Sequence, residues 1–319
     1  MAFQRLRTSR TGRVLVVTFD NPPRHFFDER MSIELDELTR ELEHDDTVGA
    51  VVFTGTDEVY MTGFHVPDLV RGARMAVLPI PVGPARLLAA VSGFAGRTRA
   101  VDRVLRRSPL RGLLLMARLY AVLDRMNRMD KVFLTAINGL ALGMGCVFAL
   151  ACDIRVLAAD KEIGMPESAI AMLAAGGGTQ RLVRMLGTAR ALELLLAGRW
   201  LDATEAADLG LVHRVVPQSQ VQAETMRLAQ RLAARSPLIN REIKRAVYDA
   251  GTRSFRRASR MEAASLIATT SVSTARRNLD RFVELQAAQP DPTDDVVKDI
   301  WRAFPQSGNG AASAQLNEK

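Results

Sequence analysis

The feature that most constrains this chain is a strand, a glycine-rich turn and a helix that follow one another directly. Residues 132–137 form an apolar, strand-like run, and the sequence from Gly139 to Gly145 leads straight into the apolar segment 146–152. A helix that begins at such a turn leaves its first backbone N–H groups without partners in the helix. These groups lie at the positive end of the helix dipole, where a negative oxygen is stabilised. The segment therefore predicts an oxyanion site made of backbone, which Gly143 and Gly145 leave open to a ligand because they carry no side chain.

The rest of the chain alternates buried strands with amphipathic helices. Apolar, β-branched runs predict further strands at 14–19, 48–54, 153–158 and 211–216, and apolar spacing predicts a helix over 31–42. This alternation is typical of an α/β fold. After residue 200 the pattern is almost all helical. The predicted organisation is a core over 1–200 with an insert at about 71–128, a helical region over 201–290, and a tail over 291–319 that is partly disordered.

Cysteine and histidine usage narrows the function class. The two cysteines, Cys146 and Cys152, fall in one predicted helix and give no disulfide framework. With no signal peptide and no apolar run of membrane-spanning length, we expect a cytoplasmic protein. The histidines lack the spacing of a metal site, and the glycines 176–178 lack the lysine of a phosphate-binding loop. We therefore expect no bound metal and no nucleotide hydrolysis.

A second glycine turn complements the first. Gly63 follows the predicted strand 48–54 and precedes the N–H group of Phe64. Two N–H groups from separate turns can converge on one carbonyl oxygen, and each such donor lowers a barrier by about 3 kcal/mol when charge develops on that oxygen. Taken alone, Gly63 is more often an ordinary turn residue.

A third segment supplies a carboxylate. Glu167 follows a proline and precedes three apolar residues, Ile170, Met172 and Leu173. An apolar surrounding would desolvate the carboxylate and raise its pKa toward that of a proton shuttle. The alternative is that Glu167 is a solvated loop residue.

Together these three segments resemble the crotonase (enoyl-CoA hydratase/isomerase) superfamily. Residues 60–65 are similar to its F-S-A-G-A-D-like motif, 138–148 to its N-G-x-A-x-G-G-G-x-E-L-like motif, and 166–182 to its P-E-x-x-x-G-x-x-P-x-x-G-G-T-Q-R-L-like motif. The resemblance extends from about Val14 to Pro217, and more loosely beyond. It implies an α/β fold of ββα repeats wound into a spiral, with a helical C-terminal region that builds trimers, often paired into hexamers.

The resemblance also implies a substrate and site residues. The substrate would be an acyl-CoA thioester, with no separate cofactor. Its carbonyl oxygen would lie between the N–H groups of Phe64 and Met144, and Glu167 would move a proton at the α-carbon. The positions expected to line the substrate are Arg24, Thr62, Gly63, His65, Gly143, Val147 and Ala174.

Departures from the family pattern constrain the reaction. Hydratases of the family use two glutamates, and the first falls at Val147, which cannot move a proton. Members with one glutamate include Δ3,Δ2-enoyl-CoA isomerases, so we favour isomerisation. Hydrolase and dehalogenase relatives need a second acid near Ala174, where none is present. The alternatives are a hydratase that positions water without the first glutamate and an acyl-CoA-binding protein without catalysis. His65 replaces a common aspartate, and a structural or solvent-facing role is its alternative to contact with the thioester.

The insert carries the positive charge of the chain. Residues 71–128 hold twelve arginines and two acidic residues, whereas the net charge of the whole chain is +8. Arg111, Arg118 and Arg125 recur every seven residues and so share one face of a predicted helix. The predicted opposite, apolar face carries Leu113, Met116, Tyr120 and Leu123.

Three roles are open for this insert. We favour a lid over the acyl chain, with its arginines facing water. Contact with an anionic membrane surface is an alternative, because basic amphipathic helices bind such surfaces. We expect no nucleic-acid partner, since the insert has few aromatic residues for stacking. Arg24, together with Arg71 and Arg74 of the insert, would pair with the phosphates of CoA.

Overall fold

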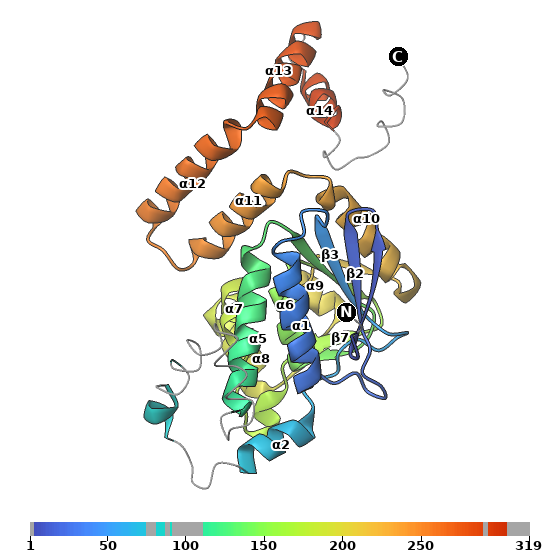
Figure 1. The fold of residues 1–319 in the computed structure, drawn as a ribbon, viewed down its shortest axis with the longest axis vertical. Helices are drawn as coiled ribbons and strands as arrows, with labels where there is room; N and C mark the ends of the chain where they lie inside the picture. The colour runs from blue at the N-terminus through green and yellow to red at the C-terminus, as the bar shows by residue number, and fades with distance from the viewer. Residues whose placement is uncertain (1–2, 75–80, 87–89, 91–110, 290–292, 305–319) are drawn as a thin grey trace. The chain divides into compact units, whose positions relative to one another are not determined.

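A computed structural model describes residues 3–74, 81–86, 90, 111–289 and 293–304 (Figure 1). The chain divides into two compact units, Met1–Ala233 and Ala234–Lys319. Half of the predicted insert (75–80, 87–89 and 91–110) lies outside the described residues, as do the side chains of Arg71, Arg74 and Arg111 and the tail after residue 304. Within the described residues, no helix is both long enough and apolar enough to cross a membrane.

A six-stranded sheet forms the centre of the first unit. Its strand order is β1-β2-β3-β4-β6-β9, with β1 antiparallel to β2 and every other neighbouring pair parallel. The strands are β1 (Leu6–Thr11), β2 (Val14–Phe19), β3 (Ala50–Gly55), β4 (Val132–Ile137), β6 (Ile154–Ala158) and β9 (Arg214–Val216). The predicted strands are all present, although β9 is shorter than predicted. A smaller sheet consists of β5 (Ala141–Leu142), β7 (Glu162–Gly164) and β8 (Trp200–Asp202).

Helices cover both faces of the central sheet. Alternate residues of β2, β3, β4 and β6 belong to two separate apolar clusters, as expected when a parallel sheet is buried on both sides. One cluster includes Phe53 and Phe133 with the helices α1 (Glu29–Leu42), α5 (Arg111–Arg128) and α6 (Met144–Ala151). The other includes Val52 and Leu134 with α10 (Val221–Ala233). Figure 1 shows α1 and α5 lying side by side.

The remaining helices complete the two units. The first unit also contains α2 (Val66–Arg74), η1 (Glu167–Ile170), α7 (Gly178–Leu186), α8 (Thr188–Ala197), α9 (Ala203–Asp208) and η2 (Gln218–Gln220). The second unit contains α11 (Pro237–Ala250), α12 (Phe255–Thr270), α13 (Ser273–Ala288) and α14 (Asp294–Arg302). The α/β class and the helical C-terminal region are thus as predicted.

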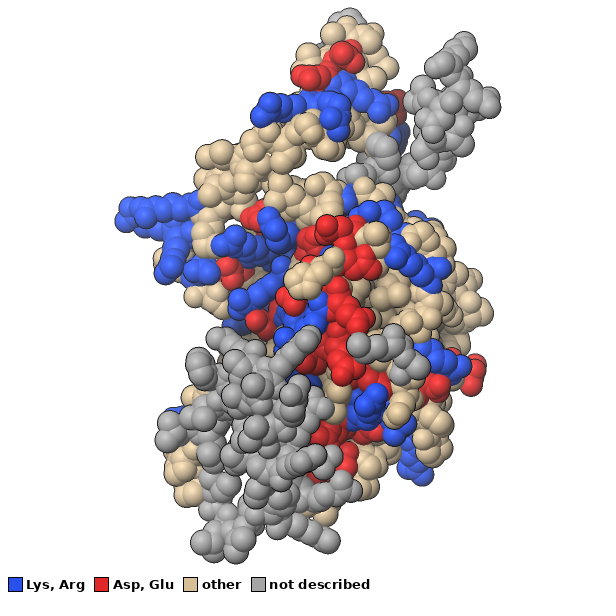
Figure 2. Space-filling view, in the orientation of Figure 1, with Lys and Arg blue, Asp and Glu red and all other residues tan. Residues whose placement is uncertain are grey.

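The helix α5 corrects the prediction that its arginines face water at Arg118 and Arg125, whereas the side chain of Arg128 is 78% exposed, as predicted. Arg118 is 5% exposed. The side chain of Arg125 is 11% exposed and lies 3.0 Å from Asp36 and 3.2 Å from Glu43. Both acids belong to α1 or its C-terminal cap, and Figure 2 shows acidic side chains gathered in a band on this side of the first unit. The prediction was wrong because α5 packs along an acidic helix, which the heptad spacing of α5 alone does not reveal.

Candidate active site

The N-terminus of α6 forms the first turn of the site. Gly143 precedes the helix with φ +53°, a conformation that favours glycine. The N–H group of Gly143 donates to Gly164 O at 2.9 Å. Among the described residues, no acceptor is recorded for the N–H group of Met144, the first residue of the helix. This N–H group is therefore available to a ligand oxygen at the positive end of the helix dipole.

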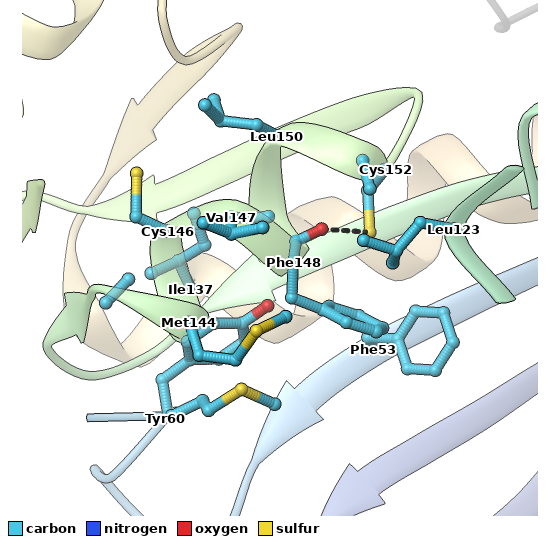
Figure 3. Packing of buried hydrophobic residues seen from close by; sticks show 14 of the residues in the cluster. Phe53, Tyr60, Leu123, Ile137, Met144, Cys146, Val147, Phe148, Leu150 and Cys152 are labelled. Carbon is cyan, nitrogen blue, oxygen red and sulfur yellow. Dashed lines mark hydrogen bonds between the residues drawn. The ribbon is translucent and has the colours of Figure 1, made fainter. Parts of the chain in front are cut away.

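The side chains of α6 face away from this turn. Every residue of the helix is buried, as expected for a helix that is apolar on all sides. Met144 itself is only 6% exposed. Figure 3 shows Met144, Val147 and Phe148 packed among buried residues that include Phe53 and Tyr60. This packing fixes the helix and therefore the direction of its first N–H groups.

The second turn, at Gly63, is held beside the first. Phe27 bridges the Gly63 turn, donating to Gly63 O at 2.8 Å and accepting the N–H of His65 at 2.9 Å. The N–H of Phe64 lies between these two hydrogen bonds in the chain, and no acceptor for it is recorded among the described residues. A parallel bridge joins Met61 to Ala141, just before each turn, and a Cβ built on Gly143 would lie 4.0 Å from the Cα of Gly63. The two glycine turns predicted from the sequence are therefore neighbours.

Glu167 lies against the first turn. A Cβ built on Gly143 would come within 3.1 Å of Glu167 Oε1, so a side chain at position 143 would press on the carboxylate. The second oxygen, Oε2, is buried and makes no hydrogen bond with the described residues. Burial raises the pKa of Glu167, and a hydrogen bond to its own backbone N–H partly opposes the shift. An unpartnered carboxylate with a raised pKa is suited to general-base chemistry.

The source of this burial differs from the prediction. Ile170, Met172 and Leu173 are 65%, 41% and 73% exposed, so they do not form an apolar pocket around Glu167 within this chain. The prediction failed because residues 167–170 form a short 3₁₀ helix whose following residues turn outward. The described neighbour at the carboxylate is instead the backbone of Gly143.

Val147 lies one helical turn beyond Gly143 and is 1% exposed. Its two methyl carbons pack against the loop at 174–178, 2.9 Å and 2.6 Å from the positions that a Cβ would take on Gly176 and Gly178. The side chain therefore fills the space over these glycines with hydrocarbon. Val147 therefore offers no group that could move a proton at this position.

The other expected substrate-binding residues lie at different depths. Ala174 is buried at 4% exposure beside the glycines. Arg24 is exposed, and its carbonyl accepts a hydrogen bond from Thr62 Oγ1 at 2.7 Å. This contact brings the guanidinium-bearing loop to the Gly63 turn. His65 Nδ1 instead lies 3.1 Å from Asp68 Oδ2, which pairs the imidazole with α2.

Two aromatic residues at the site were not predicted as functional. The ring of Phe26 lies 3.9 Å from the position that a Cβ would take on Gly63. Tyr120 Oη accepts a hydrogen bond from the N–H of Gly176 at 3.1 Å, although the helical pattern placed Tyr120 on the apolar face and its side chain is 47% exposed. Neither residue belongs to a recognised sequence motif, so these contacts could not be predicted from the sequence.

The described residues contain no group of three or more histidine, cysteine or acidic side chains that could hold a metal ion. Cys146 is a buried free thiol, and burial raises its pKa far above its usual range. A thiol in this state is a small apolar residue and a poor nucleophile. The arrangement places the carboxylate of Glu167, a group that can move a proton, beside the two glycine turns.

Comparisons with known proteins give the family. A family model described as enoyl-CoA hydratase/isomerase matches residues 106–290. A probable mitochondrial enoyl-CoA hydratase of Dictyostelium discoideum is 26% identical over 278 residues, covering 87% of each chain. A short-chain-enoyl-CoA hydratase of Clostridioides difficile is 43% identical over 117 residues, which are 37% of this chain and 75% of that protein.

Solved structures agree on the fold. An enoyl-CoA hydratase from Polaromonas sp. JS666 superposes with a TM-score of 0.74 at 24% identity, covering 88% of this chain and 96% of the other. An enoyl-CoA hydratase from Bacillus anthracis gives 0.72 at 22% identity, with the same coverage. The predicted crotonase-like fold is thereby confirmed, and the chain belongs to the enoyl-CoA hydratase/isomerase family.

Proposed function

We propose that this protein isomerises the double bond of an enoyl-CoA, with Glu167 as its base. Glu167 takes a proton from C2 of a Δ3-enoyl thioester, and the electron pair moves onto the thioester oxygen to give a dienolate. The same carboxyl group then returns the proton to C4, which leaves the Δ2 isomer. No atom is gained or lost in this sequence, so no cofactor is consumed and coenzyme A enters only as part of the substrate.

The observation that carries the proposal is the carboxylate of Glu167, whose Oε2 is buried without a hydrogen-bond partner among the described residues and whose Oε1 lies beside the Gly143 turn. The dienolate oxygen would bind the N–H groups of Phe64 and Met144. Donors fixed in advance in this way contribute about 3 kcal/mol each when charge develops on the oxygen. The raised pKa of Glu167 makes its carboxylate a stronger base toward the C2 proton, because its pKa lies closer to that of the carbon acid.

A hydratase is the second candidate, because the relatives carry that name. A carnitinyl-CoA dehydratase of Citrobacter koseri, 29% identical over 73% of this chain and 76% of that protein, likewise suggests chemistry with water. Hydration here would need a water molecule held without a carboxylate at Val147. The packed methyl groups of that side chain favour isomerisation instead.

Other properties of the protein follow from the same proposal. Arg24 would pair with a phosphate of CoA near the Gly63 turn. We propose a homotrimer or a hexamer, because α12 and α13 expose large apolar side chains such as Leu266 (64%), Ile267 (70%) and Val283 (63%). We propose a cytoplasmic location and a lid role for the insert, with membrane-surface contact as its alternative.

The proposal is tested with purified protein and a panel of Δ2- and Δ3-enoyl-CoAs, followed by mass and ultraviolet absorbance. We expect interconversion of the isomers, loss of turnover in Glu167→Gln, and retained CoA binding in that variant. A 3-hydroxyacyl product would instead support the hydratase. Tight binding without any product would support an acyl-CoA-binding protein, and full turnover by Glu167→Gln would contradict both enzymatic proposals.

A further inference from the structure

The peptide at Gly176 is held from both sides by long side chains. Tyr120, on α5, accepts the N–H of Gly176 at its Oη, 3.1 Å away. Arg181, on α7, donates from Nη1 to the carbonyl of the same residue at 3.2 Å. Gly176 has φ +67°, so its backbone adopts a conformation that few other residues share. Side chains from two helices therefore hold the two peptide groups on either side of the Gly176 Cα.

Both side chains that contact Gly176 are connected with α5: Tyr120 belongs to it, and Arg181 is hydrogen-bonded to it. Arg181 Nη2 donates to Asn127 Oδ1 at 2.9 Å, and Asn127 lies two helical turns beyond Tyr120. Asn127 in turn donates from Nδ2 to the carbonyl of Ala151 at 2.8 Å, at the C-terminal end of α6. The helix α5 thus connects the glycine loop at 174–178 with α6, whose N-terminus carries one of the two proposed oxyanion donors, the N–H of Met144.

The fixed peptide is also part of the wall around Val147. A Cβ at Gly176 would lie 2.9 Å from Val147 Cγ1 and 3.3 Å from Leu119 Cδ2, so both side chains pack directly on this glycine. Val147 stands one turn from Gly143, against which Glu167 lies. A displacement of Gly176 would therefore change the surface beside the proposed proton shuttle.

We propose that Tyr120 is a positioning residue whose hydroxyl fixes the Gly176 peptide and thereby sets the acyl-pocket wall at Val147. Its role toward an acyl chain rests on the proposed function. Tyr120 acts through the loop, and the property it controls is the length and bulk of the acyl chain that the site accepts.

The direct test removes only the hydroxyl. Tyr120→Phe keeps the ring, which lies 4.0 Å from the Cβ position of Gly177. Tyr248→Phe, in α11 of the other compact unit, is the matched control. Hydrogen exchange of the peptide spanning 174–178 should speed up at least tenfold in Tyr120→Phe and stay unchanged in Tyr248→Phe. Losing one hydrogen bond should lower the melting temperature by no more than about 4 °C. Unchanged exchange at Gly176 would overturn the inference.

The functional readout is selectivity in binding, which needs no turnover. Calorimetry with butyryl-CoA and decanoyl-CoA, two saturated thioesters, gives the ratio of their Kd values for each variant. We expect this ratio to change at least fivefold in Tyr120→Phe, to shift in the same direction in Arg181→Lys, and to change less than additively in the double variant. Tyr248→Phe should keep the wild-type ratio.

The possible outcomes distinguish the positioning role of Tyr120 from the proposed acyl-CoA function. If wild-type protein binds both thioesters and the ratio is unchanged in Tyr120→Phe, the positioning role is wrong while the acyl-CoA function stands. If wild-type protein binds neither thioester, the proposed function fails and the pocket role fails with it. If Tyr120→Phe does not fold, Arg181→Lys provides the same comparison, and an unchanged ratio there overturns the inference.

Discussion

At the scale of single residues, the site depends on how Glu167 and Gly143 share space. The carboxylate can approach the start of α6 because position 143 has no side chain, and the positive φ of that residue begins the helix there. The glycine turn and its free N–H groups could be predicted from the sequence, because a glycine turn before a helix is a local pattern. The partners of Glu167 could not be predicted, since the residues that follow it in the chain turn away from it.

The raised pKa of Glu167 gives a signed prediction for pH. The base must be ionised, so kcat should rise with pH through a pKa above that of an ordinary glutamate. A carboxyl whose folded-state pKa is raised binds its proton more tightly in the folded state. Its contribution to stability is therefore full below the unfolded pKa and is lost as pH rises through the folded pKa.

Glu167→Gln should consequently be more stable than the wild type at pH 8, with a difference that disappears at pH values below about 4. Urea unfolding at both pH values measures this difference. Loss of stability in the variant at pH 8 would mean that the ionised carboxylate has a stabilising partner, which would contradict the site described above.

The space at Gly143 gives a second prediction. Gly143→Ala places a Cβ 3.1 Å from Glu167 Oε1 and strains a backbone at φ +53°. Turnover should fall by at least about a hundredfold, because a small misplacement of a catalytic group has that effect. Gly12→Ala is the matched control, since Gly12 has φ +57° but open space around it. It should show the backbone penalty of about 1 kcal/mol and wild-type turnover. Equal turnover in the two variants would show that contact with Glu167 is unimportant.

At the scale of elements, α5 makes contacts with other helices that cannot be predicted from the sequence of α5 itself. Periodicity correctly predicted a helix and its apolar face at Leu123, yet Arg118 is buried, Arg125 is largely covered and Tyr120 is exposed. Arg125 is covered because α1 presents Asp36 and the cap residue Glu43 to α5. Burial of a charged residue such as Arg125 depends on a partner of opposite charge, and the spacing of residues within one helix does not show whether another helix supplies that partner.

The ion pairs of Arg125 should therefore stabilise the fold. Arg125→Ala leaves Asp36 without its partner from α5, with an expected loss of about 2 kcal/mol in the free energy of unfolding. Arg128→Ala, three residues further along α5, removes an i,i+4 pair whose arginine side chain is 78% exposed. This control should show no measurable change, because exposed pairs contribute little. Equal losses in urea unfolding would contradict the distinction.

At the scale of the whole molecule, the fold followed from the three motifs and the alternation of strands and helices. The order β1-β2-β3-β4-β6-β9 keeps most parallel neighbours in the order of the chain, which is why strand prediction translated well into a sheet. The surface of the C-terminal helices was harder to anticipate. Phe255 at 87% exposure and Ile267 at 70% are apolar residues that a lone chain leaves in water.

This exposure predicts assembly. Light scattering after size exclusion should give three or six times the chain mass of 35.0 kDa, because apolar surface of this kind marks an interface. Ile267→Asp should shift the mass toward that of one chain, whereas Arg276→Asp on the exposed side of α13 should not. A wild-type mass of a single chain would contradict the proposed oligomer.

The central claim is that a single carboxylate moves a proton without adding water. The most direct measurement is the mass and double-bond position of the product formed from a Δ3-enoyl-CoA in water labelled with heavy oxygen. The account predicts the Δ2 isomer at unchanged mass, without heavy oxygen and only when Glu167 is present. A 3-hydroxyacyl-CoA that carries the heavy oxygen would contradict it.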